Sequence, residues 1–367
     1  MQYNERHMFL GGNTPLGFYS YYDNIIDRAS AKRFFCIKGG PGTGKSSYMK
    51  RIADKFIQMG ERVEIFHCSG DPHSLDGVRL VERDIALVDA TSPHVVDPKY
   101  PGAIDEIINL GQFWHEKGII EMASDIISTQ TNISYEYSRA YKYLNAASYI
   151  STDTCDMIER CTDNDGINSV IKDITSNFIT KASETGSTNR KRKLFASAIT
   201  PAGLVNYCDT VLYNCKRVIG LYIGDDKGEM LAADRIMNRI SMVADENGYS
   251  HEVFYCPMMP EKRMEHIVIP ELELGFTVLG KYSNDETVAT KIYNLNEHVN
   301  RAKLRGYGDK ISENENMYRA LLLNAQSALK DAYWLHNTLE SYYVPNIDFD
   351  GVEESCVATI DKIMKIS

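Results

Sequence analysis

The sequence predicts an α/β protein made of two similar halves in tandem, each with a parallel sheet followed by a helical segment. Three observations lead to this expectation. Strand and helix patterns alternate in the N-terminal part, the second half repeats the first, and each half ends in a long stretch of helical periodicity. With 367 residues, 43% of them apolar, the chain is long enough for two domains with substantial cores.

Strands and a helix follow one another in the N-terminal half. Residues 34–37 form a short apolar run that predicts a strand, and residues 63–66 and 85–88 predict two more. Between the first two strands, apolar residues recur at helical spacing from Met49 onward, and Gly60 marks the end of that helix. This alternation is typical of a parallel sheet covered by helices.

A helix is also expected near the N-terminus. Thr14 and Pro15 have the residue types preferred at the N-cap and first position, so we expect a helix from there to about Ile26. The pair recurs as Thr200 and Pro201 in the second half. Because both halves keep it, we interpret the pair as a capping feature rather than as a ligand contact.

A glycine-rich loop connects the first of these strands to its helix. Residues 39–46 fit the template G-x-x-x-x-G-K-[ST] of a loop that binds nucleoside triphosphate. In such a loop, backbone N–H groups surround the phosphate oxygens, Lys45 reaches the β- and γ-phosphates, and the Ser46 hydroxyl can ligate Mg²⁺. The residues expected to bind the nucleotide are Gly39, Gly40, Pro41, Gly42, Thr43, Gly44, Lys45, Ser46 and Ser47. No N-K-x-D segment for guanine is present, so ATP and Mg²⁺ are the expected ligands.

Two aspartates at the ends of strands are candidates for metal binding and catalysis. Asp89 directly follows residues 85–88, where a carboxylate would hold Mg²⁺ together with Ser46; a turn-forming role is the alternative. Asp71 could position water or an acceptor hydroxyl, with a simple turn residue as the alternative. We therefore predict Lys45, Asp89 and Asp71 as catalytic residues, and Ser46 and Asp89 as metal ligands.

Other residues near this segment are weaker candidates. His94 and Asp97 could approach the γ-phosphate, although ordinary loop residues are the more common interpretation, and Arg79 and Arg83 could stabilise charge. Ala90 occupies the position after Asp89 where many ATP-hydrolysing motor proteins have a glutamate that activates water. We therefore expect slow hydrolysis.

The second half repeats the first at a nearly constant offset but lacks the phosphate-binding residues. Phe9, Thr14, Pro15, Gly17, Tyr21 and Asp23 recur as Phe195, Thr200, Pro201, Gly203, Tyr207 and Asp209. Glu229 replaces Lys45, Met230 replaces Ser46, and Val278 replaces Asp89; Asp225 and Asp226 add negative charge. These acids would repel phosphate, so we expect a degenerate second loop and one nucleotide site per chain.

Helical periodicity dominates residues from about 119 to 174 and from about 311 to 366. Five tyrosines in the first stretch do not all fit one helix face: Tyr135, Tyr137, Tyr141, Tyr143 and Tyr149. They either pack between helices or present a surface to a protein partner.

We place the domains at 1–180 and 194–367. Residues 181–193, which end in a basic run, are interpreted as a solvated linker, with a phosphate-contacting patch as the alternative.

Composition narrows the possible partners and the compartment. A net charge of −10 and a pI near 5.5 argue against broad affinity for nucleic acid or anionic membranes. The eight cysteines form no C-x-x-C pair, and the chain has no secretory N-terminus and no apolar run of about 20 residues. We therefore expect a cytoplasmic protein with reduced thiols.

With these features together, the chain resembles a poorly characterised family of tandem P-loop ATPases found chiefly in Gram-positive bacteria. The resemblance covers almost the whole length and is most specific in residues 7–15, 39–46 and 97–102. It implies an ATP-binding module, with Lys45, Ser46 and Asp89 at the motif positions, and no settled substrate.

Three functions are compatible with the sequence. The first is a Mg²⁺-dependent ATPase or phosphotransferase with one active site in the N-terminal half. The second is a switch in which bound ATP changes how the tyrosine-rich helices meet a protein partner. The third, favoured least, is a nucleic-acid-associated ATPase that uses the basic run.

Overall fold

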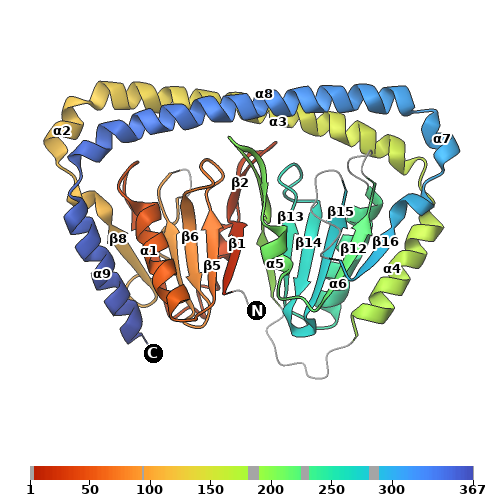
Figure 1. The fold of residues 1–367 in the computed structure, drawn as a ribbon, viewed down its shortest axis with the longest axis horizontal. Helices are drawn as coiled ribbons and strands as arrows, with labels where there is room; N and C mark the ends of the chain where they lie inside the picture. Colours follow the sequence, from red (N-terminus) through yellow and green to blue (C-terminus); the bar gives the residue numbers. More distant parts are fainter. Residues whose placement is uncertain (1–3, 93–94, 181–189, 225–230, 281–288, 367) are drawn as a thin grey trace.

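The structure is a computed structural model that describes residues 4–92, 95–180, 190–224, 231–280 and 289–366. Two lobes stand side by side, each built on a six-stranded sheet, and a pair of long helices spans both of them (Figure 1). The fold is therefore α/β, as expected, and the sheets of the two lobes have the same number of strands.

The first lobe contains the predicted strands and helix, and its six-stranded sheet has three further strands that the sequence did not predict. The predicted elements are β4 (Arg33–Lys38), α1 (Lys45–Gln58), β5 (Val63–His67) and β7 (Ile85–Asp89). The additional strands are β1 (Glu5–Phe9), β6 (Leu75–Leu80) and β8 (Asp105–Asn109). The order is β1-β5-β6-β7-β4-β8, and β6 runs antiparallel to both of its neighbours. The sheet is thus mixed, and the expectation of a purely parallel sheet is wrong at β6.

The second lobe repeats this topology strand for strand. Its sheet consists of β9 (Lys191–Leu194), β13 (His251–Tyr255), β14 (Met264–Ile269), β15 (Leu274–Leu279), β12 (Arg217–Tyr222) and β16 (Lys291–Asn294), in that order. Here β14 is the strand antiparallel to its neighbours, as β6 is in the first lobe. Helix α6 (Leu231–Glu246) corresponds to α1, and the 3₁₀ helix η3 (Pro270–Leu272) precedes β15. The sequence repeat is therefore a structural repeat.

The helix expected after Thr14 is absent, and a hairpin takes its place. Strands β2 (Gly11–Thr14) and β3 (Gly17–Ser20) pair antiparallel and lead into the short η1 (Tyr22–Asn24). The Thr14 hydroxyl donates to the Gly17 carbonyl at 2.7 Å and accepts from the Leu16 N–H at 3.1 Å. The prediction was wrong because a threonine that bonds to nearby backbone stabilises a tight turn as readily as a helix start.

The second copy of this segment has the same form. Strands β10 (Ser197–Thr200) and β11 (Gly203–Asn206) make a hairpin, and α5 (Cys208–Leu212) follows where the first lobe has η1. Thr200 donates to Gly203 and accepts from the Ala202 N–H, as Thr14 does in its own turn. The capping interpretation of Thr200 as a helix start is therefore also wrong.

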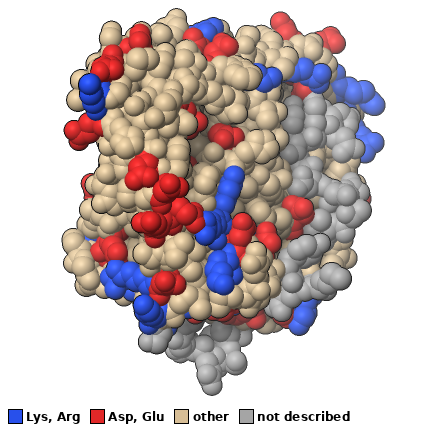
Figure 2. Space-filling model, turned by 60° about the vertical axis from the view of Figure 1, so that its left-hand side comes forward, with Lys and Arg blue, Asp and Glu red and all other residues tan. Residues whose placement is uncertain are grey.

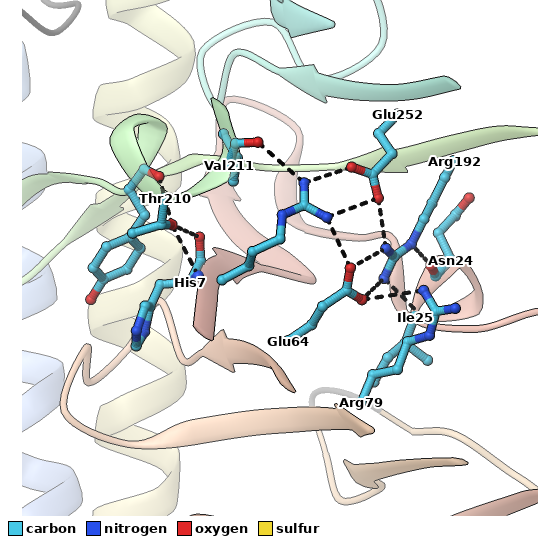
Figure 3. A network of polar contacts seen from close by, with 11 residues as sticks. His7, Asn24, Ile25, Glu64, Arg79, Arg192, Thr210, Val211 and Glu252 are labelled. Carbon is cyan, nitrogen blue, oxygen red and sulfur yellow. Dashed lines mark hydrogen bonds and ion pairs between the residues drawn. The ribbon is translucent and has the colours of Figure 1, made fainter. Parts of the chain in front are cut away.

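The basic run at residues 190–193 belongs to the junction between the lobes rather than to a linker. Arg192, in strand β9, is only 7% exposed, and its guanidinium donates to Glu64 of the first lobe and Glu252 of the second at 2.7–2.9 Å (Figure 3). Arg6 contacts the same two carboxylates at 3.0 and 2.6 Å. The solvated-linker interpretation is therefore wrong for Arg192, which carboxylates of both lobes neutralise. Arg190 pairs with Asp27 of the first lobe at 3.6 Å, and Lys193 is exposed.

The two sheets meet along strands β1 and β9. Phe9 and Phe195 exchange backbone hydrogen bonds of 2.9 and 3.1 Å, and both side chains are fully buried. Burial acts to raise the pKa of Glu64, but Arg192, Arg79 and Arg6 outweigh it and hold that pKa well below its ordinary value. The junction thus combines a buried aromatic pair with a buried ion network.

The helical segments exchange partners between the lobes. Helices α2 (Glu116–Glu121), α3 (Ala123–Glu159) and α4 (Asn164–Phe178) follow the first sheet, and α7 (Arg301–Arg305), α8 (Gly308–Tyr343) and α9 (Phe349–Lys365) follow the second. Helix α3 crosses to the second lobe, where α4 packs on α6; α8 crosses back, and α9 packs on α1 (Figure 1). Each lobe is thus completed by a helix from the other repeat.

Helices α3 and α8 lie side by side and form what we call the helical arch. Small buried residues, among them Ala140 and Ala147 on α3 and Ala325 and Ala328 on α8, allow the two helices to approach closely. Packing between helices, one of the two alternatives for the tyrosines of α3, applies to three of the five. Tyr137, Tyr141 and Tyr143 pack against the arch core, whereas Tyr135 and Tyr149 are exposed.

Within the described ranges, no helix has the length and apolar character to cross a membrane.

Candidate functional site

The glycine-rich loop leaves the end of β4 and enters α1 at the edge of the first sheet that faces the arch (Figure 1). Gly44, the N-cap of α1, has φ of 82°, and Gly42 has φ of 68°, both in the left-handed region that favours glycine. A Cβ on Gly42 would also lie 2.8 Å from the Val344 side chain. The loop therefore requires glycine at position 42 both for its backbone conformation and for close packing.

Lys45 folds back over this loop. Its ammonium donates to the carbonyls of Gly39 and Gly40 at 3.0 and 2.8 Å and lies 3.6 Å from a carboxylate oxygen of Asp89. The two side chains are only 13% and 16% exposed. The structure thus brings together two of the residues that the sequence predicted as catalytic, Lys45 at the start of α1 and Asp89 at the end of β7.

Asp89 and Ser46 lie at the same edge. Strand β7 pairs parallel with β4 so that Asp89 stands opposite Ile37, two residues before the loop begins. One Asp89 oxygen accepts from the Thr91 N–H at 2.9 Å and from the Thr91 hydroxyl. The Ser46 hydroxyl accepts from the Leu75 N–H at 3.0 Å. The Lys45 ammonium and the Asp89 carboxylate are therefore in contact, and Ser46 is the next residue after Lys45 in the first turn of α1.

The third predicted catalytic residue has a different environment. Asp71 lies in the turn between β5 and β6, where its two oxygens accept from the His73 N–H at 3.1 Å and from the Ser74 hydroxyl at 2.6 Å. This geometry is that of a turn-forming aspartate. No direct contact between Asp71 and the loop or Asp89 is found in the described part of the chain.

The weaker candidates are not directed at the loop either. Arg79 bonds to Glu64 at 3.3 Å, and Arg83 bonds to Glu61 at 2.7 Å. Asp97 is exposed and accepts from Lys38, the last residue of β4, at 3.1 Å. His94 lies outside the described residues.

A buried polar group that sequence reasoning missed lies next to Asp89. Asp76 in β6 is 3% exposed and precedes Gly77, which pairs with Val88 of β7. Burial is the main cause that raises the pKa of the Tyr22 hydroxyl, and the negative charge of Asp76 adds to it. Burial also raises the pKa of the Cys68 thiol. No sequence signal indicated this group, because Tyr22 and Asp76 are far apart in the chain and are brought together only by the tertiary structure.

A second group of missed residues comes from the other repeat. The segment 340–352, which joins α8 to α9 and which we call the elbow, lies directly on the loop together with Trp114. The Glu340 carboxylate accepts from the Gly42 N–H at 3.2 Å. Trp114 and Tyr343 flank Gly40, with ring centroids 6.3 Å apart. The interaction with His336, together with the Gly42 N–H and the charge of Lys45, holds the pKa of Glu340 below its ordinary value.

The equivalent position in the second lobe lacks the carboxylate. Val278 of β15 stands opposite Leu221 of β12, the same register that places Asp89 opposite Ile37. Gly224, with φ of 96°, is the last described residue before the second loop. Asp225, Asp226, Glu229 and Met230, on which the expectation of a degenerate loop depends, lie outside the described residues.

A cluster of three or more metal-binding side chains does not occur among the residues that the structure describes. A Mg²⁺ site at this loop would be of another kind, since that ion is commonly held by one or two protein groups, water and the phosphates of its ligand. Comparisons with family models, with curated proteins and with solved structures each returned no match.

Proposed function

We propose that this chain binds Mg²⁺·ATP at a single site formed by residues 39–47 and Asp89, and that it hydrolyses ATP or transfers its phosphoryl group slowly. The observation that supports the proposal most strongly is the convergence of Lys45 and Asp89, 3.6 Å apart, beside a loop with the phosphate-binding pattern. A loop ammonium and a strand-end carboxylate are the two charges that a metal-bound triphosphate requires.

Each residue has a defined role in this proposal. On nucleotide binding, Lys45 would exchange its loop carbonyls for the β- and γ-phosphate oxygens. Ser46 and Asp89 would hold Mg²⁺, Ser46 directly and Asp89 through water. Turnover is expected to be slow because Ala90 follows Asp89 and because Asp71, the other candidate base, is engaged within its own turn.

A nucleotide-dependent switch is the second candidate, and the elbow favours it. Because residues of α8 lie against the loop, occupation of the loop would act directly on a helix that spans both lobes. This candidate uses the same binding site and differs only in the output, which would be a change at the arch rather than a product.

The nucleic-acid candidate loses the central residue of the basic run that suggested it. Arg192, at the centre of the basic run, is buried between carboxylates of both lobes. On the face of the first lobe shown in Figure 2, acidic and basic side chains are interspersed and form no broad basic field among the described residues. We therefore do not propose nucleic acid as a ligand.

The test is calorimetric titration of the purified chain with Mg²⁺·ATP. The expected result is one nucleotide per chain, with affinity about 10- to 100-fold lower in Lys45→Ala, since a charge-assisted contact to phosphate is lost. Lys55→Ala, an exposed lysine on the same helix, is the matched control and should bind normally. Two equivalent sites, or normal binding by Lys45→Ala, would refute the proposed site.

Hydrolysis is measured separately as steady-state ADP release. The expected basal rate is below about one turnover per second, near the low end of enzyme rates. Rapid unstimulated turnover would show that another residue activates water and would count against the switch candidate.

A further inference from the structure

A carboxylate from the second repeat occupies part of the phosphate-binding loop of the first. Glu340, in the last turn of α8, accepts a hydrogen bond of 3.2 Å from the Gly42 N–H. The loop comes from the N-terminal repeat, and Glu340 lies 298 positions further along the chain. Its side chain is 40% exposed, so this is a partly solvated contact rather than a fixed part of the core.

The contact is supported on both sides. On α8, His336 lies 3.5 Å from Glu340, one helical turn away. On the loop, Lys45 contributes an attractive charge to the same carboxylate. Tyr343 and Val344, which follow Glu340, pack against Gly40 and Gly42. The elbow thus presents one anion to the loop and covers it with apolar contacts.

A carboxylate and a phosphate have the same requirement at this position. Both are anions that accept from backbone N–H groups, and one N–H group cannot serve both. Their negative charges also repel at such short range. A triphosphate seated in the loop would therefore have to displace Glu340 from Gly42.

We propose that Glu340 is an internal competitor of the polyphosphate ligand, so that ligand binding releases the end of α8 from the loop. This inference rests on the proposed function, since it concerns the same loop. It adds a regulatory step: the second repeat, which lacks the Asp89 carboxylate, controls access to the site of the first through its exchanged helix. Conversely, a partner that binds only when α8 is away from the loop would strengthen ligand binding. The ligand would strengthen the binding of that partner by the same factor.

The experiment uses a tryptophan that the fold places at this contact. The chain has two tryptophans, and Trp334 is exposed on α8, so Trp334→Phe leaves Trp114, beside Gly40 and Tyr343, as the single reporter. In this background, Glu340→Gln removes the charge and keeps the size of the side chain. Glu313→Gln, an exposed glutamate near the other end of α8, is the matched control. Each protein is titrated with Mg²⁺·ATP and with inorganic tripolyphosphate.

The expected result is a dissociation constant about three- to tenfold lower for both probes in Glu340→Gln, and no change in Glu313→Gln. The change in Trp114 fluorescence on binding should also be smaller, because in Glu340→Gln the charged contact between the elbow and the loop is already absent before the ligand binds. An unchanged or higher dissociation constant in Glu340→Gln would overturn the inference. In particular, weaker binding or slower turnover would identify Glu340 as a group that supports the ligand.

The failure of this inference can be told apart from the failure of the proposed function. If the parent protein binds both probes, Lys45→Ala does not, and Glu340→Gln equals the parent, the binding site stands and only the competition is refuted. If the parent and Glu340→Gln both fail to bind either probe, the proposed function falls and the inference falls with it.

Discussion

At the scale of single residues, the candidate site depends on a pair of side chains from different elements, Lys45 of α1 and Asp89 of β7. Asp89 accepts from the turn that follows it, and it also faces Lys45, so the turn-forming and metal-binding interpretations are compatible. The Thr91 contacts orient the carboxylate, and its remaining oxygen is the one closest to the ammonium. Asp89 is thus positioned before any ligand is present.

Asp89→Asn should weaken the Mg²⁺ dependence of ATP binding by about tenfold or more, the range typical for groups that orient metal-bound water. The amide keeps the size and loses the charge. The measurement is ATP affinity as a function of Mg²⁺ concentration. Asp97→Asn, at an exposed carboxylate paired with Lys38, is the control and should behave as wild type. Normal Mg²⁺ dependence in Asp89→Asn would assign the metal to another carboxylate.

A buried histidine in the second lobe should make the protein sensitive to acid. His266 is 1% exposed, with Nδ1 2.9 Å from the Thr277 hydroxyl, and burial lowers its pKa to about 3. In the unfolded chain a histidine titrates near 6.5. Below that pH the unfolded chain takes up a proton that the folded protein does not, so stability falls as the pH falls from about 6.5 towards 3.

The free energy of unfolding should therefore decrease on acidification by up to about 1.4 kcal/mol per pH unit from this residue alone. Urea unfolding at pH 7.5 and pH 5.5 measures it. In His266→Gln this part of the loss should disappear, whereas His115→Gln, at an exposed position, should keep it. An equal pH dependence in wild type and His266→Gln would refute the assignment.

At the scale of elements, the exchanged helices explain why each lobe depends on the other repeat. Helix α9 contributes Ile363 to the core around α1, and the Tyr48 hydroxyl of α1 bonds to Thr359 of α9 at 2.6 Å. Helix α4 contributes Ile174 to the core of the second lobe around α6. Both isoleucines are fully buried, so the two contacts form a matched pair.

Ile363→Ala should destabilise the first lobe, and Ile174→Ala the second, each by about 2–5 kcal/mol. Hydrogen exchange followed along the chain distinguishes the two. Ile363→Ala should speed exchange in α1 more than in α6, and Ile174→Ala should do the reverse. Faster exchange in the lobe that belongs to the mutated helix's own repeat would mean that the helices are not exchanged.

At the scale of the whole molecule, the junction and the arch tie the two repeats into one unit. The buried network contains equivalent residues from the two copies: Arg6 and Arg192 lie in corresponding strands, as do Glu64 and Glu252. Removing one member would leave the others buried without full neutralisation, which is commonly more costly than the net gain from the intact group.

Residues 1–188 and 189–367, produced as two polypeptides in the same cell, should therefore co-purify as a one-to-one complex. Each half alone should aggregate, because α4 or α9 would lack its core partner. Glu64→Gln should weaken the complex by about 100-fold. Size-exclusion chromatography of the halves, alone and mixed, tests this. Two folded, monomeric halves that do not associate would contradict it.

The sequence by itself determined the local elements and the motif. Strands β4, β5 and β7, helix α1, the repeat and the position of Asp89 at a strand end all follow from short-range patterns of apolar residues and glycine. Such patterns indicate which face of a segment is buried, and in the folded chain these segments bury the faces that their patterns indicate. The Thr14 hairpin was missed because the same residue types can cap a helix or close a turn.

Only the tertiary structure decided which segments meet. The antiparallel strand β6, the burial of Arg192 between Glu64 and Glu252, and the contact of Glu340 with Gly42 join residues far apart in the chain. From sequence alone, an arginine in a basic run or a glutamate on a long helix is expected to be solvated. Burying a charge is costly unless an opposite charge is buried with it. The partner is supplied by the other repeat, and no local pattern encodes that pairing.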